Sequence, residues 1–300
     1  MRCSRRRFLV IAAAAAVLAP SRRETWRWRG SALGAEAEIR LSGEREDVEA
    51  ALAAAVAEIG RLERIFSLNQ ADSQLSALNR TGHLIAPARD LVATLDAAGR
   101  WRQKTEGAFD IAVQPLWLEA AGFGERREAL ERVRSTRIGM FPGRIELASG
   151  GALTLNGIAQ GTTADRVTEL LRARGFEAPL IDTGEMRLPG AEWRRVRLPG
   201  AGLALRLAEC AVATSAPGAL RFESGRHHLF DPRDGSSPAL WRSVTVIAPE
   251  AETADALSTA FAVSGPERIG DLVPQDVGVI ATDCEGQVRR FGHVPALAEA

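Results

Sequence analysis

The sequence at residues 244–263, VTVIAPEAETADALSTAFAV, predicts a strand followed within a few residues by a helix. Val244, Val246 and Ala248 recur at every second position, which is the period of a strand with a buried face. Pro249 ends this strand. Acidic residues then crowd the first turn of an apolar segment, where carboxylates interact favourably with the positive end of a helix dipole.

Two oxygen-bearing side chains on this helix indicate a candidate metal site. Asp255 and Thr259 are four residues apart, so a helix places them on one face, about one turn from each other. Mg²⁺ accepts hard oxygens of this kind, usually few from protein and the rest from water and phosphate. The alternative is structural, because first-turn carboxylates also favour the helix dipole and helical threonines also bond to backbone carbonyls.

The first residues have the order of an export signal. Three consecutive arginines, Arg5 to Arg7, precede an alanine-rich apolar run that is too short to span a bilayer. This pattern predicts a twin-arginine signal peptide over residues 1–25, a periplasmic location, and a mature domain over residues 26–300. An anchor that is left uncleaved is the alternative.

Composition excludes some functions. The chain has 38 basic and 38 acidic residues, so it carries no overall charge of the kind that nucleic-acid binding requires. Lys104 is the only lysine, which argues against Schiff-base chemistry and a lysine-rich phosphate site. Cys210 and Cys284 follow the signal; they could pair in an oxidising compartment or remain as buried thiols.

Further periodic segments predict a mixture of helices and strands that do not alternate strictly. This arrangement favours an α+β fold over a doubly wound α/β fold. The predicted helices are residues 46–66, 89–105 and 162–174, and the predicted strands are residues 26–41, 179–190, 193–198, 202–206 and 211–215, with two more around Gly150-Gly151 within residues 140–155.

A glycine-rich turn, NGIAQG at residues 156–161, opens the third helix. Backbone N–H groups near Gly157 and Gly161 could face a phosphate there, although a tight strand–helix turn explains the same glycines. His227 and His228 are adjacent, so in a strand only one of them faces a given site. Histidine is the natural proton acceptor near neutral pH, but one beside an Asp-Pro turn is often structural.

Seven motifs, taken in order, resemble the ApbE family of periplasmic FAD:protein FMN transferases. The resemblance covers nearly the whole predicted mature chain. The motifs are LGA at residues 33–35, FS at 66–67 with DSQLS at 72–76, GAFD and QPL within 107–116, NGIAQG at 156–161 with Asp165, ATS at 213–215, HLFDPR at 228–233, and SVTVIA with ADALSTA within 243–260.

The resemblance implies a single compact two-lobed domain, related to the T-fold, with a flavin cleft. It implies Mg²⁺-dependent transfer of FMN from FAD to a threonine or serine hydroxyl of a partner flavoprotein, with release of AMP. By the motif match, Asp255 and the Thr259 hydroxyl would bind the metal with the carbonyls of Ser258 and Gly157, and His228 would be the base. The FAD contacts would fall on Leu33, Asn69, Ala108, Phe109, Asp110, Thr154, Gln160 and the Leu229–Phe230 region.

Three positions depart from the family pattern. Thr154 stands where the family usually has aspartate, Gln160 where lysine or glutamate is frequent, and Asn156 where a small residue is usual. The run TLNGIAQG resembles the NosX-like branch, which is associated with nitrous-oxide reductase maturation and would supply FMN to a NosR-like membrane protein. Two other functions remain open: a periplasmic FAD hydrolase that releases FMN and AMP, and a carrier that binds FAD without turnover.

Overall fold

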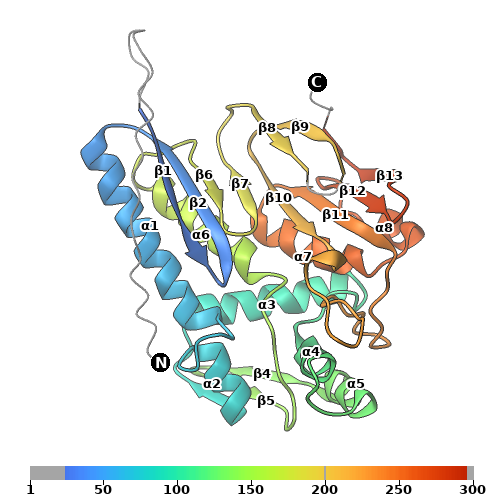
Figure 1. The fold of residues 1–300 in the computed structure, drawn as a ribbon. Helices are drawn as coiled ribbons and strands as arrows, with labels where there is room; N and C mark the ends of the chain where they lie inside the picture. Colours follow the sequence, from blue (N-terminus) through green and yellow to red (C-terminus); the bar gives the residue numbers. More distant parts are fainter. Residues whose placement is uncertain (1–23, 199–200, 296–300) are drawn as a thin grey trace.

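An antiparallel eight-stranded sheet is the centre of the fold in the computed structural model, which describes residues 24–198 and 201–295 (Figure 1). Its strand order is β1-β2-β6-β7-β10-β11-β12-β13, and each neighbouring pair is antiparallel. The strands are β1 (Thr25–Ala32), β2 (Ala35–Ser42), β6 (Leu180–Asp182), β7 (Met186–Leu188), β10 (Cys210–Ser215), β11 (Trp241–Ala248), β12 (Gly278–Asp283) and β13 (Val288–Gly292).

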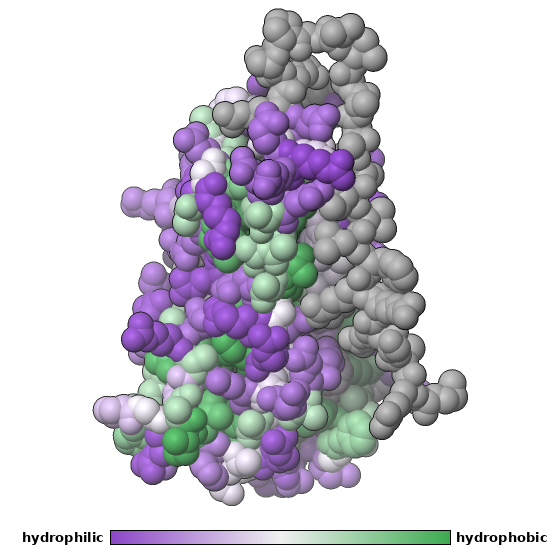
Figure 2. All heavy atoms as spheres, turned by 90° about the vertical axis from the view of Figure 1, so that its left-hand side faces the viewer, coloured by the Kyte–Doolittle hydropathy of each residue, from purple (hydrophilic) through white to green (hydrophobic). Residues whose placement is uncertain are grey.

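Helices form a layer against this sheet. Helix α7 (Ala251–Ala262) packs on β10 and β11, helix α6 (Ala159–Arg172) packs on α7, and helix α1 (Arg45–Phe66) packs on α6. Helix α3 (Arg89–Lys104) contacts both α1 and α7. The outer side of α1 is polar, and Figure 2 shows that face of the molecule as mostly hydrophilic with scattered hydrophobic residues. Burial of the inner faces therefore holds this layer in place.

A short hairpin covers part of the other face of the sheet. Strands β8 (Arg194–Arg197) and β9 (Ala204–Leu207) pair with each other outside the main sheet. A second, smaller core lies between this hairpin and the sheet, and it contains Leu188, Val196, Leu198, Leu205, Leu207, Val212, Ile247 and Ile280. Strands β10, β11 and β12 are therefore buried on both faces, which explains their nearly continuous apolar sequences.

Apart from η2 and α8, which contact β11 and β13 of the main sheet, the remaining elements form a second lobe, drawn below the main sheet in Figure 1. A three-stranded sheet of order β3-β5-β4 lies beside helix α2, and helices α4 and α5 pack on each other. The architecture is α+β, as the sequence predicted. The bounds are α2 (Gln74–Thr81), β3 (His83–Ile85), η1 (Ile111–Val113), α4 (Gln114–Ala120), α5 (Arg126–Ser135), β4 (Ile138–Phe141), β5 (Arg144–Leu147), η2 (Pro217–Ala219) and α8 (Pro266–Leu272).

Two predicted strands are in fact hairpins. The strand predicted over residues 26–41 is divided into β1 and β2 by a turn at Leu33 and Gly34, whose φ angles are 50° and 91°. The strand predicted over residues 179–190 is divided into β6 and β7 by a turn that contains Gly184, with φ of 99°. Side-chain alternation continues on both sides of each turn, so periodicity alone did not locate the reversal.

The prediction for residues 140–155 is also wrong. The hairpin turn of β4 and β5 lies at Gly143, not at Gly150-Gly151, and residues 151–155 form no strand. The backbone of Leu153 is instead paired with the Asn79 side chain, which donates to the Leu153 carbonyl and accepts from its N–H, both at 2.8 Å. A side-chain amide thus satisfies backbone groups that a neighbouring strand would otherwise satisfy.

The predicted signal lies outside the described residues, except for its last two positions. Within the described residues, none of the helices combines the length and the apolar character that crossing a membrane requires.

The two cysteines of the described residues, Cys210 and Cys284, are free thiols in different environments. Cys284 is exposed, and burial raises the pKa of the Cys210 thiol to about 11. Because the thiolate is the reactive form, we expect a thiol reagent at pH 8 to modify Cys284 rapidly and Cys210 much more slowly. In a chain that begins at residue 24, and so lacks Cys3, the Cys284→Ser substitution should remove the fast phase of modification. A fast phase that persists in this variant would contradict the assignment.

Candidate functional site

A cavity of about 220 Å³ lies where helix α7, the turn before α6 and the loop around His228 meet. It combines apolar side chains with hydroxyls, an amide and carboxylates, and no Arg or Lys of the described residues lines it. The lining residues are Ala108, Asp110, Val113, Trp117, Thr154, Asn156, Gly157, Gln160, Glu185, Thr214, Ser215, Ala216, Ala219, His228, Leu229, Phe230, Pro232, Asp255 and Thr259.

Asp255 and Thr259 both face this cavity from α7, as their spacing predicted. The first turn of α7 is held by Asp165 of α6, whose carboxylate accepts from the N–H groups of Ala251 at 3.0 Å and Glu252 at 2.9 Å. A capping carboxylate of this kind satisfies orphan donors and favours the helix dipole. The position of both candidate ligands is therefore set by a contact between α6 and α7.

Helix α6 also contacts Asp255 directly. The N–H of Gly161 donates to Asp255 Oδ2 at 3.0 Å, so this amide is not available to a phosphate. The expectation that Gly161 contributes a free N–H group is therefore corrected. At the other glycine, a methyl group added to Gly157 would lie 2.8 Å from the Thr259 Oγ1, so glycine allows the backbone to approach the hydroxyl.

Asp255 is a buried carboxylate without a cationic partner. Its exposed fraction is 2%, and none of the ion pairs among the described residues includes it. Burial raises the pKa of Asp255 to about 7, the Gly161 N–H opposes this rise, and the charges of Glu252 and Asp165 add to it. A buried carboxylate of this kind is stabilised when a cation binds beside it.

Mg²⁺ fits the oxygen donors that meet here. Asp255, the Thr259 hydroxyl and the backbone at Gly157 supply hard oxygens from one corner of the cavity. Across the described residues there is no group of three or more His, Cys, Asp or Glu suited to a metal ion. A site with few carboxylates matches Mg²⁺, which keeps water and phosphate ligands, better than it matches zinc.

Glu185 is a second buried carboxylate in the cavity, and sequence analysis missed it. It follows Gly184 in the β6–β7 turn, and its carboxylate accepts from the Thr214 N–H at 3.2 Å. Burial, and next the charge of Asp255, raise the pKa of Glu185 well above its ordinary value. The signal available in the sequence was Gly184 inside the predicted strand, because a glycine there can mark a turn; the structure places its φ at 99° and brings the following side chain to the end of the sheet.

The two adjacent histidines have different roles. The His227 ring is buried, accepts from the Leu229 N–H at 3.2 Å and bonds to the Pro238 carbonyl at 3.1 Å, so both of its nitrogens are occupied. His228 lines the cavity, and its Nδ1 lies 3.3 Å from the Leu220 carbonyl. A carbonyl only accepts, so Nδ1 carries the proton and Nε2 remains the acceptor. Burial lowers the pKa of His228, which keeps the ring neutral.

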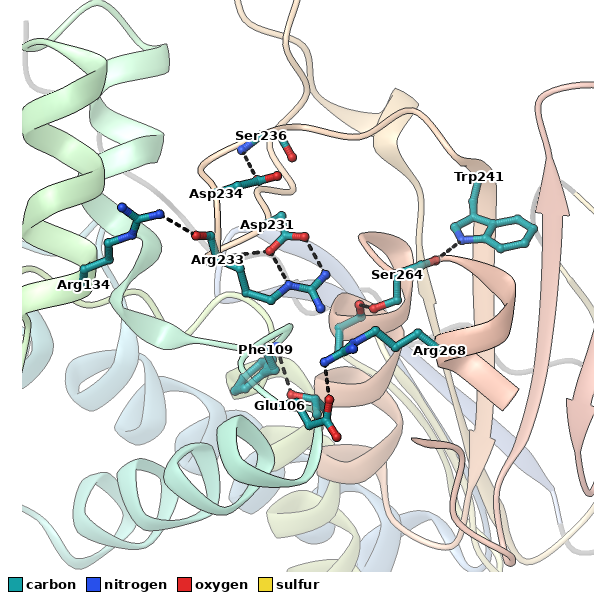
Figure 3. A network of polar contacts seen from close by, with 12 residues as sticks. Glu106, Phe109, Arg134, Asp231, Arg233, Asp234, Ser236, Trp241, Ser264 and Arg268 are labelled. Atoms are coloured by element: carbon teal, nitrogen blue, oxygen red, sulfur yellow. Dashed lines mark hydrogen bonds and ion pairs between the residues drawn. The ribbon is translucent and has the colours of Figure 1, made fainter. Parts of the chain in front are cut away.

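A polar network holds the loop that follows His228 (Figure 3). Arg233 binds Asp231 through two parallel contacts, Nε to Oδ1 at 2.7 Å and Nη2 to Oδ2 at 2.5 Å. Arg134 of α5 donates to the Arg233 carbonyl at 2.9 Å, while Glu106 beside the loop pairs with Arg268 of α8. The network therefore fixes the wall of the cavity to which Phe230 belongs.

Comparison with known proteins identifies the family. A sequence model of the ApbE family matches residues 33–281. The chain belongs to the ApbE family. A relative from Treponema pallidum, which is named FAD:protein FMN transferase, is 31% identical to this chain over 297 residues. The alignment covers 83% of this chain and 81% of the relative. A Klebsiella pneumoniae relative of the same name is 29% identical over 234 residues, covering 70% and 74%.

Solved structures support the ApbE fold. The flavinyl transferase ApbE of Pseudomonas stutzeri, in its apo form, matches with a TM-score of 0.78 over 91% of this chain and 96% of that chain. The apbe protein of Thermotoga maritima matches with a TM-score of 0.79 over 89% and 97%. Both are 22% identical to this chain, so they show a shared fold.

Most of the site residues expected of an ApbE protein meet in the cavity. Those that line it are Ala108, Asp110, Thr154, Gly157, Gln160, His228, Phe230, Asp255 and Thr259. Of the departures from the family pattern, Thr154 accepts from the Asn156 N–H at 3.2 Å, and Gln160 packs against Gly184. These departures therefore lie in the cavity wall.

The other predicted residues do not line the cavity. Phe109 is buried in the core, and Ser258 is fully buried with its Oγ 2.8 Å from Ser215 Oγ. Leu33 lies at the β1–β2 turn, where its N–H donates to Glu63 at 3.1 Å. Asn69 is close to the same turn, because a methyl group on Gly34 would lie 3.4 Å from its Nδ2. Leu33 and Asn69 are thus neighbours of each other.

Proposed function

We propose that this chain transfers the FMN part of FAD to a threonine or serine hydroxyl of a partner flavoprotein and releases AMP, with Mg²⁺ as the cofactor. The observation that carries the proposal is the cavity itself. It places the buried Asp255, the Thr259 hydroxyl and the free Nε2 of His228 around one space in a chain of the ApbE family.

Each group has a defined task in this reaction. Asp255 and Thr259 would hold the cation, which when bound would supply positive charge to the diphosphate and to the leaving AMP. His228 accepts the proton of the acceptor hydroxyl at Nε2. Transfer between phosphates depends mainly on position and charge, so the protein needs no covalent intermediate of its own.

The apolar side of the cavity suits the flavin ring. Trp117, Leu229 and Phe230 line it, and Phe222 joins Trp117 to Phe230 through ring contacts with centroids 5.1 Å and 6.2 Å apart. Aromatic side chains bury large apolar area and stack with planar ligands. We place the isoalloxazine against this side and the diphosphate toward Asp255.

The test is direct labelling of an acceptor. The purified protein, FAD, Mg²⁺ and an acceptor flavoprotein domain should give a fluorescent acceptor band that survives denaturing electrophoresis, and an acceptor without its target hydroxyl should stay dark. Free FMN and AMP without a labelled band would indicate an FAD hydrolase. FAD that stays bound and unchanged would indicate a carrier.

His228→Gln should lower the rate of transfer by about 10²–10⁴-fold, the usual contribution of a positioned base. In the wild-type chain at saturating Mg²⁺, the rate should fall as pH decreases through the pKa of His228, because the protonated ring cannot accept a proton. Burial lowers this pKa, so the fall should lie below pH 6.5, the ordinary value. The rate measured from pH 5 to 8 tests this.

His227→Gln is the matched control, since the His227 ring is held by the Leu229 N–H and the Pro238 carbonyl. It should leave the pH dependence of the transfer rate unchanged. Any decrease in the rate itself should come from a lower stability of the folded protein. A profile that disappears in His227→Gln and persists in His228→Gln would contradict the assignment of the base.

We also propose export through the twin-arginine route and action in the periplasm, which rests on the arginines and the apolar run of residues 1–25. The run TLNGIAQG supports a NosR-like membrane protein as the acceptor. Fractionation of cells that express the full chain tests the location, and replacing Arg5, Arg6 and Arg7 with Lys should retain the protein in the cytoplasm.

A further inference from the structure

Glu185 lies in the cavity without a role in the reaction described above. Its side chain is 8% exposed, and it belongs to the short turn between β6 and β7. Gly184 before it has φ of 99°, and a methyl group there would lie 2.8 Å from the Gln160 Cδ. The turn therefore packs against α6, and the Thr214 N–H holds the Glu185 carboxylate.

Two short series of contacts connect Glu185 with Asp255. On one side, Thr214 donates to Glu185, and the next residue, Ser215, bonds to Ser258, whose hydroxyl donates to the Asp255 carbonyl at 3.0 Å. On the other side, Gly184 contacts Gln160, and the next residue, Gly161, donates to the Asp255 carboxylate. The first series ends at the backbone of Asp255 and the second at its carboxylate, and both Glu185 and Asp255 line the same cavity, so the two groups face one space.

The charge in this space is not balanced by the protein. Among the described residues, neither Glu185 nor Asp255 forms an ion pair, and no Arg or Lys lines the cavity. The third acidic group of the lining, Asp110, is different, because Arg102 binds it at 2.7 Å. Two buried carboxylates without a cationic partner together match the charge of one divalent cation.

We propose that Glu185 is a second acidic ligand of the Mg²⁺ site, acting on the cation directly or through one of its water molecules. The inference rests on the proposed function, and it extends the ligand set beyond Asp255, Ser258, Thr259 and Gly157. Mg²⁺ is usually held by one or two carboxylates and keeps several waters, so a carboxylate on the opposite wall fits its coordination.

The second carboxylate has a consequence for the order of binding. Once deprotonated, Asp255 and Glu185 supply two negative charges, so Mg²⁺ can bind, with release of their protons, before any diphosphate is present. FAD then enters a cavity whose charge is already neutral, so it meets no net repulsion. A site with Asp255 alone would instead depend on the phosphates of FAD to complete the binding of the cation.

The experiment is a titration of the FAD-free, metal-free protein with Mg²⁺, followed by calorimetry, and with Mn²⁺, followed by electron paramagnetic resonance. The wild-type chain should bind one cation. Glu185→Gln should weaken this binding by at least about 10-fold, as loss of a supporting ligand group does. Asp255→Asn should weaken it at least as much. Asp110→Asn, whose carboxylate is already neutralised by Arg102, should change it by less than about 2-fold.

The other outcomes are distinct. If Glu185→Gln binds the cation as the wild type does while Asp255→Asn does not, the inference about Glu185 is wrong and the proposed function stands. If neither substitution changes the binding, the cation site of the proposed function is wrong. If Asp110→Asn weakens binding as much as Glu185→Gln, the effect reflects general charge in the cavity, and the specific assignment is overturned. A melting temperature for each variant confirms that it is folded.

Discussion

Asp255→Asn is expected to reduce FMN transfer by about 10³-fold or more and, at the same time, to stabilise the metal-free protein. The loss of activity follows because an uncharged amide binds the cation more weakly than a carboxylate does, and the reaction needs this cation to balance the charge of the diphosphate. The gain in stability follows because Asp255 is 2% exposed and carries a charge without an ionic partner. An asparagine of the same shape can still accept the Gly161 N–H through its amide oxygen.

The sign of the stability effect depends on pH. The pKa of Asp255 is raised from 3.8 to about 7, so folding favours its protonated form. Near pH 4 the wild type and Asp255→Asn should therefore be similar in stability. As pH rises toward 8, the free energy of unfolding of the wild type falls relative to that of the variant. The expected difference is about 2–4 kcal/mol, since each unit by which the pKa is raised corresponds to 1.36 kcal/mol.

Denaturant unfolding at pH 5 and pH 8, with a metal chelator present, measures this difference. Asp271→Asn in α8 removes an exposed carboxylate and should change the free energy of unfolding by less than about 0.5 kcal/mol at either pH. Adding Mg²⁺ at pH 8 should stabilise the wild type and leave Asp255→Asn unchanged. An equal response of both chains to Mg²⁺ would be evidence against Asp255 as a ligand.

Gly161→Ala is expected to destabilise the protein by about 3 kcal/mol or more, because α6 and α7 touch through their backbones at this glycine. A methyl group there would overlap the Ala251 carbonyl and lie 2.8 Å from the Glu252 Cα. Neither atom belongs to a flexible side chain, so the helices must move apart. The same movement would separate the Gly161 N–H from Asp255 and disturb the candidate metal site.

Gly99→Ala is the matched control for this substitution. Gly99 lies inside α3, and a methyl group on it would meet no atom within 4 Å. The change should stabilise the protein by about 0.5–1 kcal/mol, since alanine loses less backbone entropy in a helix. Thermal and denaturant unfolding of the two variants compare the positions, and a Gly161→Ala protein as stable as the wild type would contradict the close helix contact.

The sequence by itself determined the elements whose side chains repeat at a regular period. The helices over residues 46–66 and 89–105 and the strand and helix of residues 244–263 have structural counterparts in α1, α3, β11 and α7. The face shared by Asp255 and Thr259 was also predicted, because it depends only on the geometry of one helix. The order of the motifs predicted the ApbE family, which the comparison confirmed.

Only the tertiary structure decided which groups from separate segments meet. Glu185 enters the cavity because a left-handed glycine turns the chain between β6 and β7, and Asn79 takes the place of a strand beside Leu153. The Gly161 amide is occupied because α6 lies directly on α7. Periodicity describes one segment at a time, whereas burial, charge balance and hydrogen-bond satisfaction depend on which segments the fold brings together.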